Sequence, residues 1–575
     1  MAIAARPASW WWKVTLCWCL TRLPVASTSP TVKDGTVSYL GTVSDGTEAF
    51  LNIRFGQDTG GERRFRNPLP YSYPAGTTVN ATAAGAACPQ VLGNPVPSFT
   101  GIYGNVTEIS EDCLSLRVSR LLGTKPSAKL PVMVYLFGGG YAFGSVYDDT
   151  AYDPSGLVRE NAAKGLPVIY AAINYRNGFL GFAASDALRN EDNLNSGLLD
   201  QYLGLEWIRD HIEAFGGSKD DVTIFGEDVG WTNVQLQLMA YGGKAKPLFH
   251  RAILQSGPTP SGTGLTAGLS DTHTAQLTGI LNCTSPTGDG HAELTCLRSL
   301  PLSVINTAAV EFGLAFESLA GLGTFRPTAP SPFIPDAPSQ LLSTGRFRQD
   351  VEILIGWNEN DGTVFVPSTI NSTAYFSAVV AALFPGLSQS NLQTLGDLYP
   401  EDAFSDYPSE GIDRNFFRAA QVVRDANFAC PSLRLAATLP PSSAYVYALN
   451  ESVFTLGHAF YNRSFVGIDH FSDMPYVLDY VAKAPYSSVA SQADYDMAAH
   501  MSGSWAAFAT HGHPTAHYNA NKTFSDWPST GGGAWLRVLG GPRDGASSIG
   551  STYGEELPAR CAFWGQSDVL AQTYA

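Results

Sequence analysis

The segment Gly226-Glu227-Asp228-Val229-Gly230 carries the clearest chemical signal in the sequence. It follows a short β-branched run, Asp221 to Phe225, and precedes a helical stretch from Thr232 to Ala240. A glycine on each side of a central residue, between a strand and a helix, is the pattern of a nucleophile elbow. The glycines are needed because the central residue is strained and neighbouring backbone approaches closely. The sequence therefore predicts a carboxylate, that of Asp228, at the reactive position.

The elements that must position this turn are visible as apolar runs. Leu130 to Phe137 stops at Gly138-Gly139-Gly140, and Pro167 to Asn174 is a second run of the same kind. Between them and the elbow, Gly197 to Phe215 has apolar residues at helical spacing and ends at a glycine pair. Buried strands alternating with helices indicate an open α/β sheet whose site lies at the strand ends.

Composition and charge exclude several classes of function. The 575-residue chain has a net charge of -16 and no cluster of basic residues, which argues against nucleic-acid binding. A mean hydropathy of -0.03 excludes a polytopic membrane protein, and we expect no stable membrane span. No CxxC pair is present, so we expect no metal, and we expect no cofactor.

The N-terminus is typical of a secretory leader. Arg6 precedes three tryptophans and an apolar stretch from Val14 to Leu20, and small residues follow at Ala26 and Ser27. We therefore expect residues 1–27 to be a signal peptide, residues 28–575 to form one domain, and the protein to be secreted or to enter the secretory pathway. The alternatives are a short uncleaved anchor or a misassigned start.

The cysteines and sequons agree with export. Two of the eight cysteines lie in the leader, and an even number remains, which suggests disulfides with fifteen possible connectivities. Several N-x-S/T sequons make glycosylation of some of them an expectation, at Asn80, Asn105, Asn282, Asn371, Asn450, Asn462 and Asn521.

From about Gly35 to Trp564 the sequence resembles the type-B carboxylesterase, fungal lipase and cholinesterase family. The matching stretches include RFRNPLPYS, LFGGGYAFGS, AINYRNGFLGF, VTIFGEDVG, ILIGWNENDGTVF, GIDHFSDMPYV and RCAFW. The resemblance implies an α/β-hydrolase fold with a large, mostly parallel central sheet flanked by helices. It also implies the disulfides Cys88–Cys113, Cys283–Cys296 and Cys430–Cys561.

The resemblance places the catalytic acid on Asp361 and the general base on His470. The serine nucleophile of the family is missing. In the family pattern G-E-S-A-G, this sequence has Asp228 in place of serine and Val229 in place of alanine, and Trp231 stands where a small residue usually follows. Three changes within four positions indicate a remodelled site.

The surroundings of the nucleophile also follow from the resemblance. The oxyanion-hole amides fall on Gly139, Gly140 and Val229, and Glu227 matches the buried glutamate beside the nucleophile.

An aspartate at this position changes the chemistry of the site. A serine is neutral until the histidine takes its proton, whereas Asp228 carries a charge beside His470 in the resting state. We expect His470 to be held as imidazolium, which removes the free base that ester hydrolysis needs. The Asp228 carboxylate is also a candidate occupant of the oxyanion hole. Loss of the nucleophile leaves residual catalysis of at most ~10³-fold over water.

Three interpretations remain open. In the first, Asp228 and His470 form a proton-transfer pair that promotes isomerisation, cyclisation, lactonisation or coupling of a small hydrophobic metabolite. In the second, Asp228 is itself a nucleophile that forms an alkyl ester, which activated water then cleaves. In the third, the protein is an inactive binding or adhesion homologue. The sequence does not give the substrate or the oligomeric state.

Each of these residues also has a simpler structural interpretation. Asp361 is able to cap a turn before Gly362, and His470 is able to serve as a buried structural histidine. The matches around both residues favour the active site instead. For Trp231, a core residue that fills the pocket floor is favoured over a platform for the substrate.

Overall fold

The computed structural model describes residues 29–94, 104–257, 268–316, 323–516, 522–531, 535–554 and 556–573. The expected leader, residues 1–27, lies outside these ranges, and so does the sequon at Asn521.

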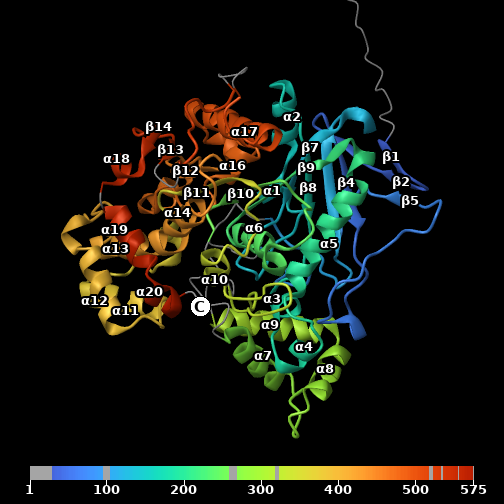
Figure 1. The fold of residues 1–575 in the computed structure, drawn as a ribbon, viewed down its shortest axis with the longest axis horizontal. Coiled ribbons are helices and arrows are strands. Elements are labelled where there is room, and N and C mark those ends of the chain that lie inside the picture. Colours follow the sequence, from blue (N-terminus) through green and yellow to red (C-terminus); the bar gives the residue numbers. More distant parts are fainter. Residues whose placement is uncertain are drawn as a thin grey trace, which may run out of the picture.

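A single large sheet organises the described part of the chain (Figure 1). Its eleven described strands lie in the order β14-β13-β12-β11-β10-β9-β7-β8-β6-β4-β3. Their bounds are β3 (Thr42–Ser44), β4 (Thr47–Arg54), β6 (Ser115–Leu121), β7 (Leu130–Tyr135), β8 (Ile169–Ile173), β9 (Gly217–Glu227), β10 (Arg251–Gln255), β11 (Glu352–Asn358), β12 (Ala444–Leu449), β13 (Trp535–Leu539) and β14 (Gly545–Ser548). The strands from β8 through β7 and β9 to β13 pair in parallel, and the two edges are antiparallel. The sheet is therefore mostly parallel, as expected.

The central strands are buried over their whole length, which is why they consist of near-continuous apolar residues. Every residue of β8 and of β12 is buried. A separate small sheet joins β1 (Thr31–Asp34), β2 (Val37–Leu40) and β5 (Thr78–Asn80).

Helices flank the large sheet, and those that precede β11 include α6, which begins at the elbow. Their bounds are α1 (Asp149–Tyr152), α2 (Ser155–Ala163), α3 (Gly178–Phe182), α4 (Asp186–Asn190), α5 (Ser196–His211), α6 (Val229–Met239), α7 (Leu269–Ile280), α8 (Gly290–Ser299), α9 (Leu302–Phe316) and α10 (Pro338–Ser343). In Figure 1, α7, α8 and α9 gather at the lower end of the molecule.

The remaining helices belong to the second half of the chain. They are α11 (Thr373–Leu383), α12 (Gln389–Leu398), α13 (Arg414–Arg424), α14 (Cys430–Ala437), α15 (Thr455–Phe460), α16 (Met474–Val477), α17 (Gln492–His511), α18 (Ile549–Tyr553), α19 (Glu556–Trp564) and α20 (Ser567–Thr573). Figure 1 shows α11, α12, α13 and α19 together on the left-hand side.

The expected elements are present, with shifted ends. The run predicted to end at Phe225 continues as strand to Glu227, because β10 pairs with β9 up to that residue. The helix predicted from Thr232 begins at Val229. Only Asp228 therefore separates β9 from α6.

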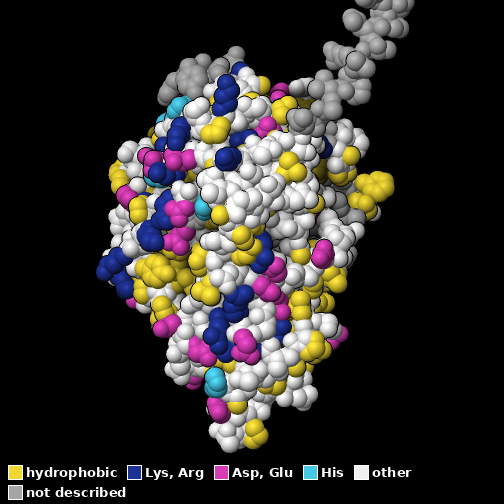
Figure 2. All heavy atoms as spheres, turned by 90° about the vertical axis from the view of Figure 1, so that its right-hand side faces the viewer, with side chains coloured by type: hydrophobic (Ala, Val, Ile, Leu, Met, Phe, Trp, Pro, Cys, Tyr) yellow, Lys and Arg dark blue, Asp and Glu magenta, His cyan; other side chains and the backbone are white. Residues whose placement is uncertain are grey.

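Charged side chains of both signs are intermixed on the face seen in Figure 2. Among the described residues, no single helix has the length and apolar character to cross a membrane, although α8 and α9, bent by 110°, pass that test as a pair.

Candidate functional site

The turn between β9 and α6 is strained in the way that the glycine pattern predicts. Asp228 has φ 57° and ψ -131°, a conformation that L-residues rarely adopt. A methyl group on Gly230 would collide with the carbonyl oxygen of Leu136, and one on Gly226 would lie 2.5 Å from the carbonyl carbon of Gly230. Glycine is thus required on both sides by close backbone approach, and the turn lifts the Asp228 side chain out of the sheet.

The carboxylate of Asp228 is held by the loop that follows β7. The amide of Gly139 donates to Asp228 Oδ2 at 2.7 Å, and the amide of Gly140 donates to the same atom at 2.9 Å. Two converging amides are the donors that an oxyanion hole presents. The Val229 amide, also expected there, makes no hydrogen bond to this carboxylate among the described residues. Asp228 therefore already occupies the two donors.

His470 and Asp361 meet beside this turn. Asp361 lies just after β11, and His470 lies between α15 and α16. Their side chains are joined by a 2.9 Å contact between His470 Nδ1 and Asp361 Oδ1. On the other side of the ring, His470 Nε2 lies 3.5 Å from Asp228 Oδ1, which is an ion-pair distance. The three residues are thus brought together in the order acid, base, elbow, at the edge of the sheet where the parallel strands β9 and β11 end.

The electrostatics of the three groups favour a resident ion pair. Burial alone would raise the pKa of Asp228, but His470 and the Gly139 and Gly140 amides outweigh it and hold that pKa below its usual value. Burial alone would lower the pKa of His470, but the carboxyl groups of Glu227, Asp228 and Asp361 raise it well above 6.5. At neutral pH the site therefore holds an aspartate and an imidazolium.

Glu227 and Asp473 add two more carboxyl groups to the site. Glu227 Oε1 lies 3.3 Å from His470 Nε2, and burial raises the pKa of Glu227 well above its usual value. Burial also raises the pKa of Asp473 to about 6, and its Oδ2 accepts a 2.7 Å hydrogen bond from Gln255. Sequence reasoning missed Asp473, although it lies three residues after His470 in the matched stretch GIDHFSD.

The pair remains accessible from outside the core. The side chain of His470 is 12% exposed and that of Asp228 is 13% exposed. Trp231, by contrast, is fully buried one turn into α6 and packs against the backbone of Gly257. The structure therefore places Trp231 in the core.

Two phenylalanine rings enclose His470. The ring centroids of Phe365 and Phe428 lie 5.1 Å and 5.4 Å from that of His470. Phe428 belongs to a π-helical turn, Asp425–Ala429, between α13 and α14. Such turns re-aim side chains inside a helix and are frequent at functional sites. Nothing in the sequence periodicity marked this turn.

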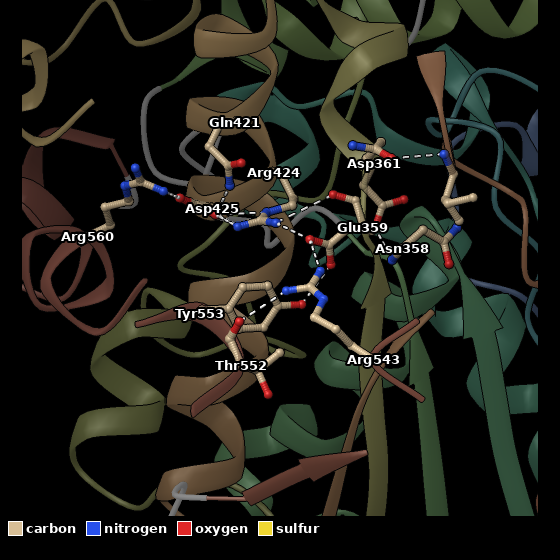
Figure 3. Close-up of polar contacts among 12 residues, drawn as sticks. Asn358, Glu359, Asp361, Gln421, Arg424, Asp425, Arg543, Thr552, Tyr553 and Arg560 are labelled. Atoms are coloured by element: carbon tan, nitrogen blue, oxygen red, sulfur yellow. Dashed lines mark hydrogen bonds and ion pairs between the residues drawn. The ribbon is translucent and has the colours of Figure 1, made fainter. Parts of the chain in front are cut away.

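A buried polar network supports this turn (Figure 3). Arg424 donates to Asp425 Oδ1 at 2.6 Å, and it also contacts Glu359, two residues before Asp361. Asp425 is fully buried. Glu359 in turn accepts from Arg543 at 3.1 Å and from Tyr553 at 2.7 Å. The network thus ties the C-terminal segment to the residues that carry Phe428 and Asp361.

Disulfides and sequons fit the expected framework. The structure forms Cys88–Cys113, Cys283–Cys296 and Cys430–Cys561, the three pairs that the resemblance implies. Of the described sequons, Asn450 is half-buried, and the exposed ones are Asn80, Asn105, Asn282, Asn371 and Asn462. Among the described residues, no group of three or more His, Cys, Asp and Glu side chains is arranged to hold a metal ion.

Comparisons with known proteins match most of the chain. A family model described as the carboxylesterase family matches residues 30–539. The chain is 37% identical over 548 residues to the inactive carboxylesterase-like protein VdtD of Byssochlamys spectabilis, covering 92% of each chain. It is 34% identical over 571 residues to a secreted lipase of Arthroderma benhamiae, covering 96% of this chain and 98% of that one.

The fold is shared with a solved structure. The crystal structure of Aspergillus niger EstA matches with a TM-score of 0.77 and 24% identity, covering 95% of this chain and 99% of that one. Together with the mostly parallel sheet, this match shows the α/β-hydrolase fold.

Proposed function

The chain belongs to the carboxylesterase family, and from that premise we propose that it has exchanged serine ester hydrolysis for chemistry carried by the Asp228–His470 ion pair. The observation that supports this proposal is the contact of Asp228 Oδ2 with both the Gly139 and Gly140 amides. In serine hydrolysis these amides stabilise charge that develops on the substrate. Here they stabilise a charge that is always present, and Asp228 stands where the family has its serine.

The pair is suited to moving two protons. His470 Nε2 gives a proton to a carbonyl or hydroxyl oxygen of the substrate, while Asp228 Oδ1 accepts one from an acidic C–H or O–H group. The 3.5 Å between these two atoms then lets the proton return from Asp228 to His470, which restores the site. Such a cycle promotes isomerisation, cyclisation, lactonisation or coupling of a small hydrophobic metabolite.

The same electrostatics limit the substrate. Because the pKa of Asp228 is held below its usual value, Asp228 is a weak base. A proton-transfer substrate must therefore carry an acidic hydrogen, as a phenol, an enol or a 1,3-dicarbonyl compound does.

The test is the conversion of such metabolites by the wild type and by two isosteric variants. We expect conversion to be lost in Asp228→Asn and in His470→Gln, and to persist in His458→Gln. His458 is the matched control, because it contacts Asp469 rather than the pair. Binding without conversion by the wild type would support the inactive-homologue interpretation instead, which is what the name of one relative describes for that protein.

A second candidate is an aspartate-nucleophile hydrolase, and the orientation of the Asp228 carboxylate favours it. Attack by Oδ1 on an alkyl carbon expels the leaving group with its electron pair and forms an ester. Its carbonyl oxygen, Oδ2, already contacts the two amides that would stabilise the oxyanion when water adds to Cγ. Alkylation also removes the charge of Asp228, which lowers the pKa of His470 and frees it to accept a proton from that water.

This candidate has a distinct signature. Turnover in ¹⁸O-labelled water places the label in the Asp228 carboxylate, and His470→Gln accumulates a substrate adduct on the peptide that holds Asp228. Conversion of a substrate with neither signature would reject the nucleophile role and leave the proton-transfer role.

We also propose that the protein is secreted, with residues 1–27 as its leader and sugar on exposed sequons. Three disulfides and relatives named secreted lipases support this. Mass spectrometry of the mature chain, before and after glycosidase treatment, tests both points: an uncleaved, unglycosylated chain would reject them.

A further inference from the structure

Asn177 is a buried amide that the chemistry above does not use. It precedes α3 and is 1% exposed. Neither Oδ1 nor Nδ2 has a hydrogen-bond partner among the described residues. Asparagine is a favoured residue at the start of a helix because its side chain caps the first amides. Here the side chain makes no such bond, so its donor nitrogen and its acceptor oxygen are both available to another molecule.

An unused buried amide is unusual enough to need a reason. Most buried polar side-chain atoms in proteins have a partner, because leaving them without one costs stability. Gln90, which lines the same cavity, shows the ordinary situation. Its Nε2 donates to the carbonyl oxygens of Cys88 and Gly144, and its Oε1 accepts from the Gly144 amide.

Asn177 lines a small cavity whose walls are otherwise mainly apolar. Phe179, Leu180, Val310 and Phe325 contribute to these walls, and no lining residue is charged. The cavity volume is about 60 Å³, several times the roughly 10–15 Å³ that one water molecule needs. It is therefore large enough to admit the head group of a ligand.

The cavity adjoins the loop that holds Asp228. Tyr141 and Ala142 line it and directly follow the Gly139-Gly140 pair. The amide of Gly178, next to Asn177, donates to the carbonyl oxygen of Tyr141 at 2.7 Å. A group bound at Asn177 would thus sit beside this loop.

We propose that Asn177 is the anchor of a ligand-binding pocket for a neutral, planar head group that carries a donor and an acceptor side by side, a carboxamide or a lactam. Its donor nitrogen and its acceptor oxygen match such a group in a pair of hydrogen bonds. A carboxylate fits poorly, because the cavity offers it no cation and burying an unpaired charge is unfavourable. The apolar walls receive the part of the ligand next to the head group.

This pocket stands apart from the proposed function, since it makes no use of the charges of Asp228 and His470. The Asp228→Ala variant is therefore expected to bind the same head groups as the wild type. A result that contradicts the pocket proposal can therefore be distinguished from one that contradicts the proposed ion-pair chemistry.

The experiment measures binding of benzamide and toluene by calorimetry. Benzamide has the donor–acceptor pair, and toluene has the same ring without it. We expect the wild type to bind benzamide at least tenfold more tightly than toluene, and Asn177→Leu to lose this preference. Asn177→Ala provides a second variant that removes the amide without filling the space.

The matched control is Asn306→Leu, the same change on another wall of the cavity. Asn306 Nδ2 already donates to the Gln90 carbonyl oxygen at 3.0 Å, so the preference for benzamide is expected to survive. Asn177→Leu should also melt no lower than the wild type without ligand, since it removes two unsatisfied atoms. Equal binding of the two probes, binding of neither, or loss of the preference in Asn306→Leu as well would overturn the proposal.

Discussion

Asp228 Oδ2 lies 2.7 Å from the amide nitrogen of Gly139, within the loop that follows β7. The second amide of this loop, that of Gly140, shares the same oxygen. The side chain thus occupies the donors with which this fold class stabilises an oxyanion. If another nucleophile were to attack an ester in this site, the Asp228 carboxylate would first have to move away from these two amides.

Replacing Asp228 by serine should restore ester hydrolysis in part. The change frees the two amides and removes one of the charges that raise the pKa of His470. We expect Asp228→Ser to cleave p-nitrophenyl acetate on the order of 10²- to 10³-fold faster than Asp228→Ala, and to be labelled by a phosphonofluoridate. The wild type should be inactive and unlabelled. Ordinary esterase rates in the wild type would contradict the assignment.

The pH dependence of stability should reveal the ion pair. The pKa of His470 is raised on folding, so its contribution to stability is complete below about pH 6.5 and is lost as pH rises through the folded pKa. The pKa of Asp228 is lowered, so its contribution is present above about pH 3.8 and is lost as pH falls through the folded pKa.

Urea unfolding of the wild type and Asp228→Asn between pH 3 and 9 measures the combined effect. The free energy of unfolding of the wild type, relative to that of the variant, should be highest between about pH 4 and 6.5 and should fall on both sides. A difference that does not change with pH would show that the two groups do not titrate as a pair.

The network around Arg424 should matter for folding. Arg424→Met removes the closer of the two arginines that pair with buried Asp425, with Arg560 remaining 3.6 Å away, and we expect a loss of about 3 kcal/mol in the free energy of unfolding. Arg414→Met, in the same helix α13, is the control, because its pair with Asp406 is exposed and its loss should change stability little. Similar effects of the two changes would mean that burial of the network is not what stabilises it.

The glycines of the elbow should not tolerate a side chain. Gly230→Ala drives a methyl group into the Leu136 carbonyl oxygen, so we expect the protein to fold poorly or not at all. Gly396→Ala is the counterpart in α12, where a methyl group meets nothing within 4 Å, and it should stabilise the protein by about 0.5–1 kcal/mol. Thermal unfolding and the yield of folded protein distinguish the two. Normal folding of Gly230→Ala would refute the close packing of the turn.

Local patterns in the sequence were sufficient for the sheet and the elbow. The buried parallel strands β7, β8 and β9 are visible in the sequence as continuous apolar runs, and the tight turn is visible as its two flanking glycines. The ends of these elements differ from the prediction where strand pairing sets them. Strand β9 extends to Glu227 because it pairs with β10, and local propensity does not reveal that pairing.

Residues whose role depends on distant packing could not be recognised in the same way. Phe428 contacts His470 from a π-helical turn, and the Asn177 side chain has no hydrogen-bond partner among the described residues. Neither property has a sequence signal, because each depends on contacts made after the chain has folded.

The carboxylate of Asp228 also fills the place that the fold offers to a developing negative charge. With Asp228 and Asp361 ionised and His470 protonated, these three groups sum to one negative charge, and the local amides are already satisfied. A transition state that gathers positive charge near Oδ1 gains from the field of the Asp228 carboxylate, whereas one that gathers negative charge on a substrate oxygen finds the two amides already occupied.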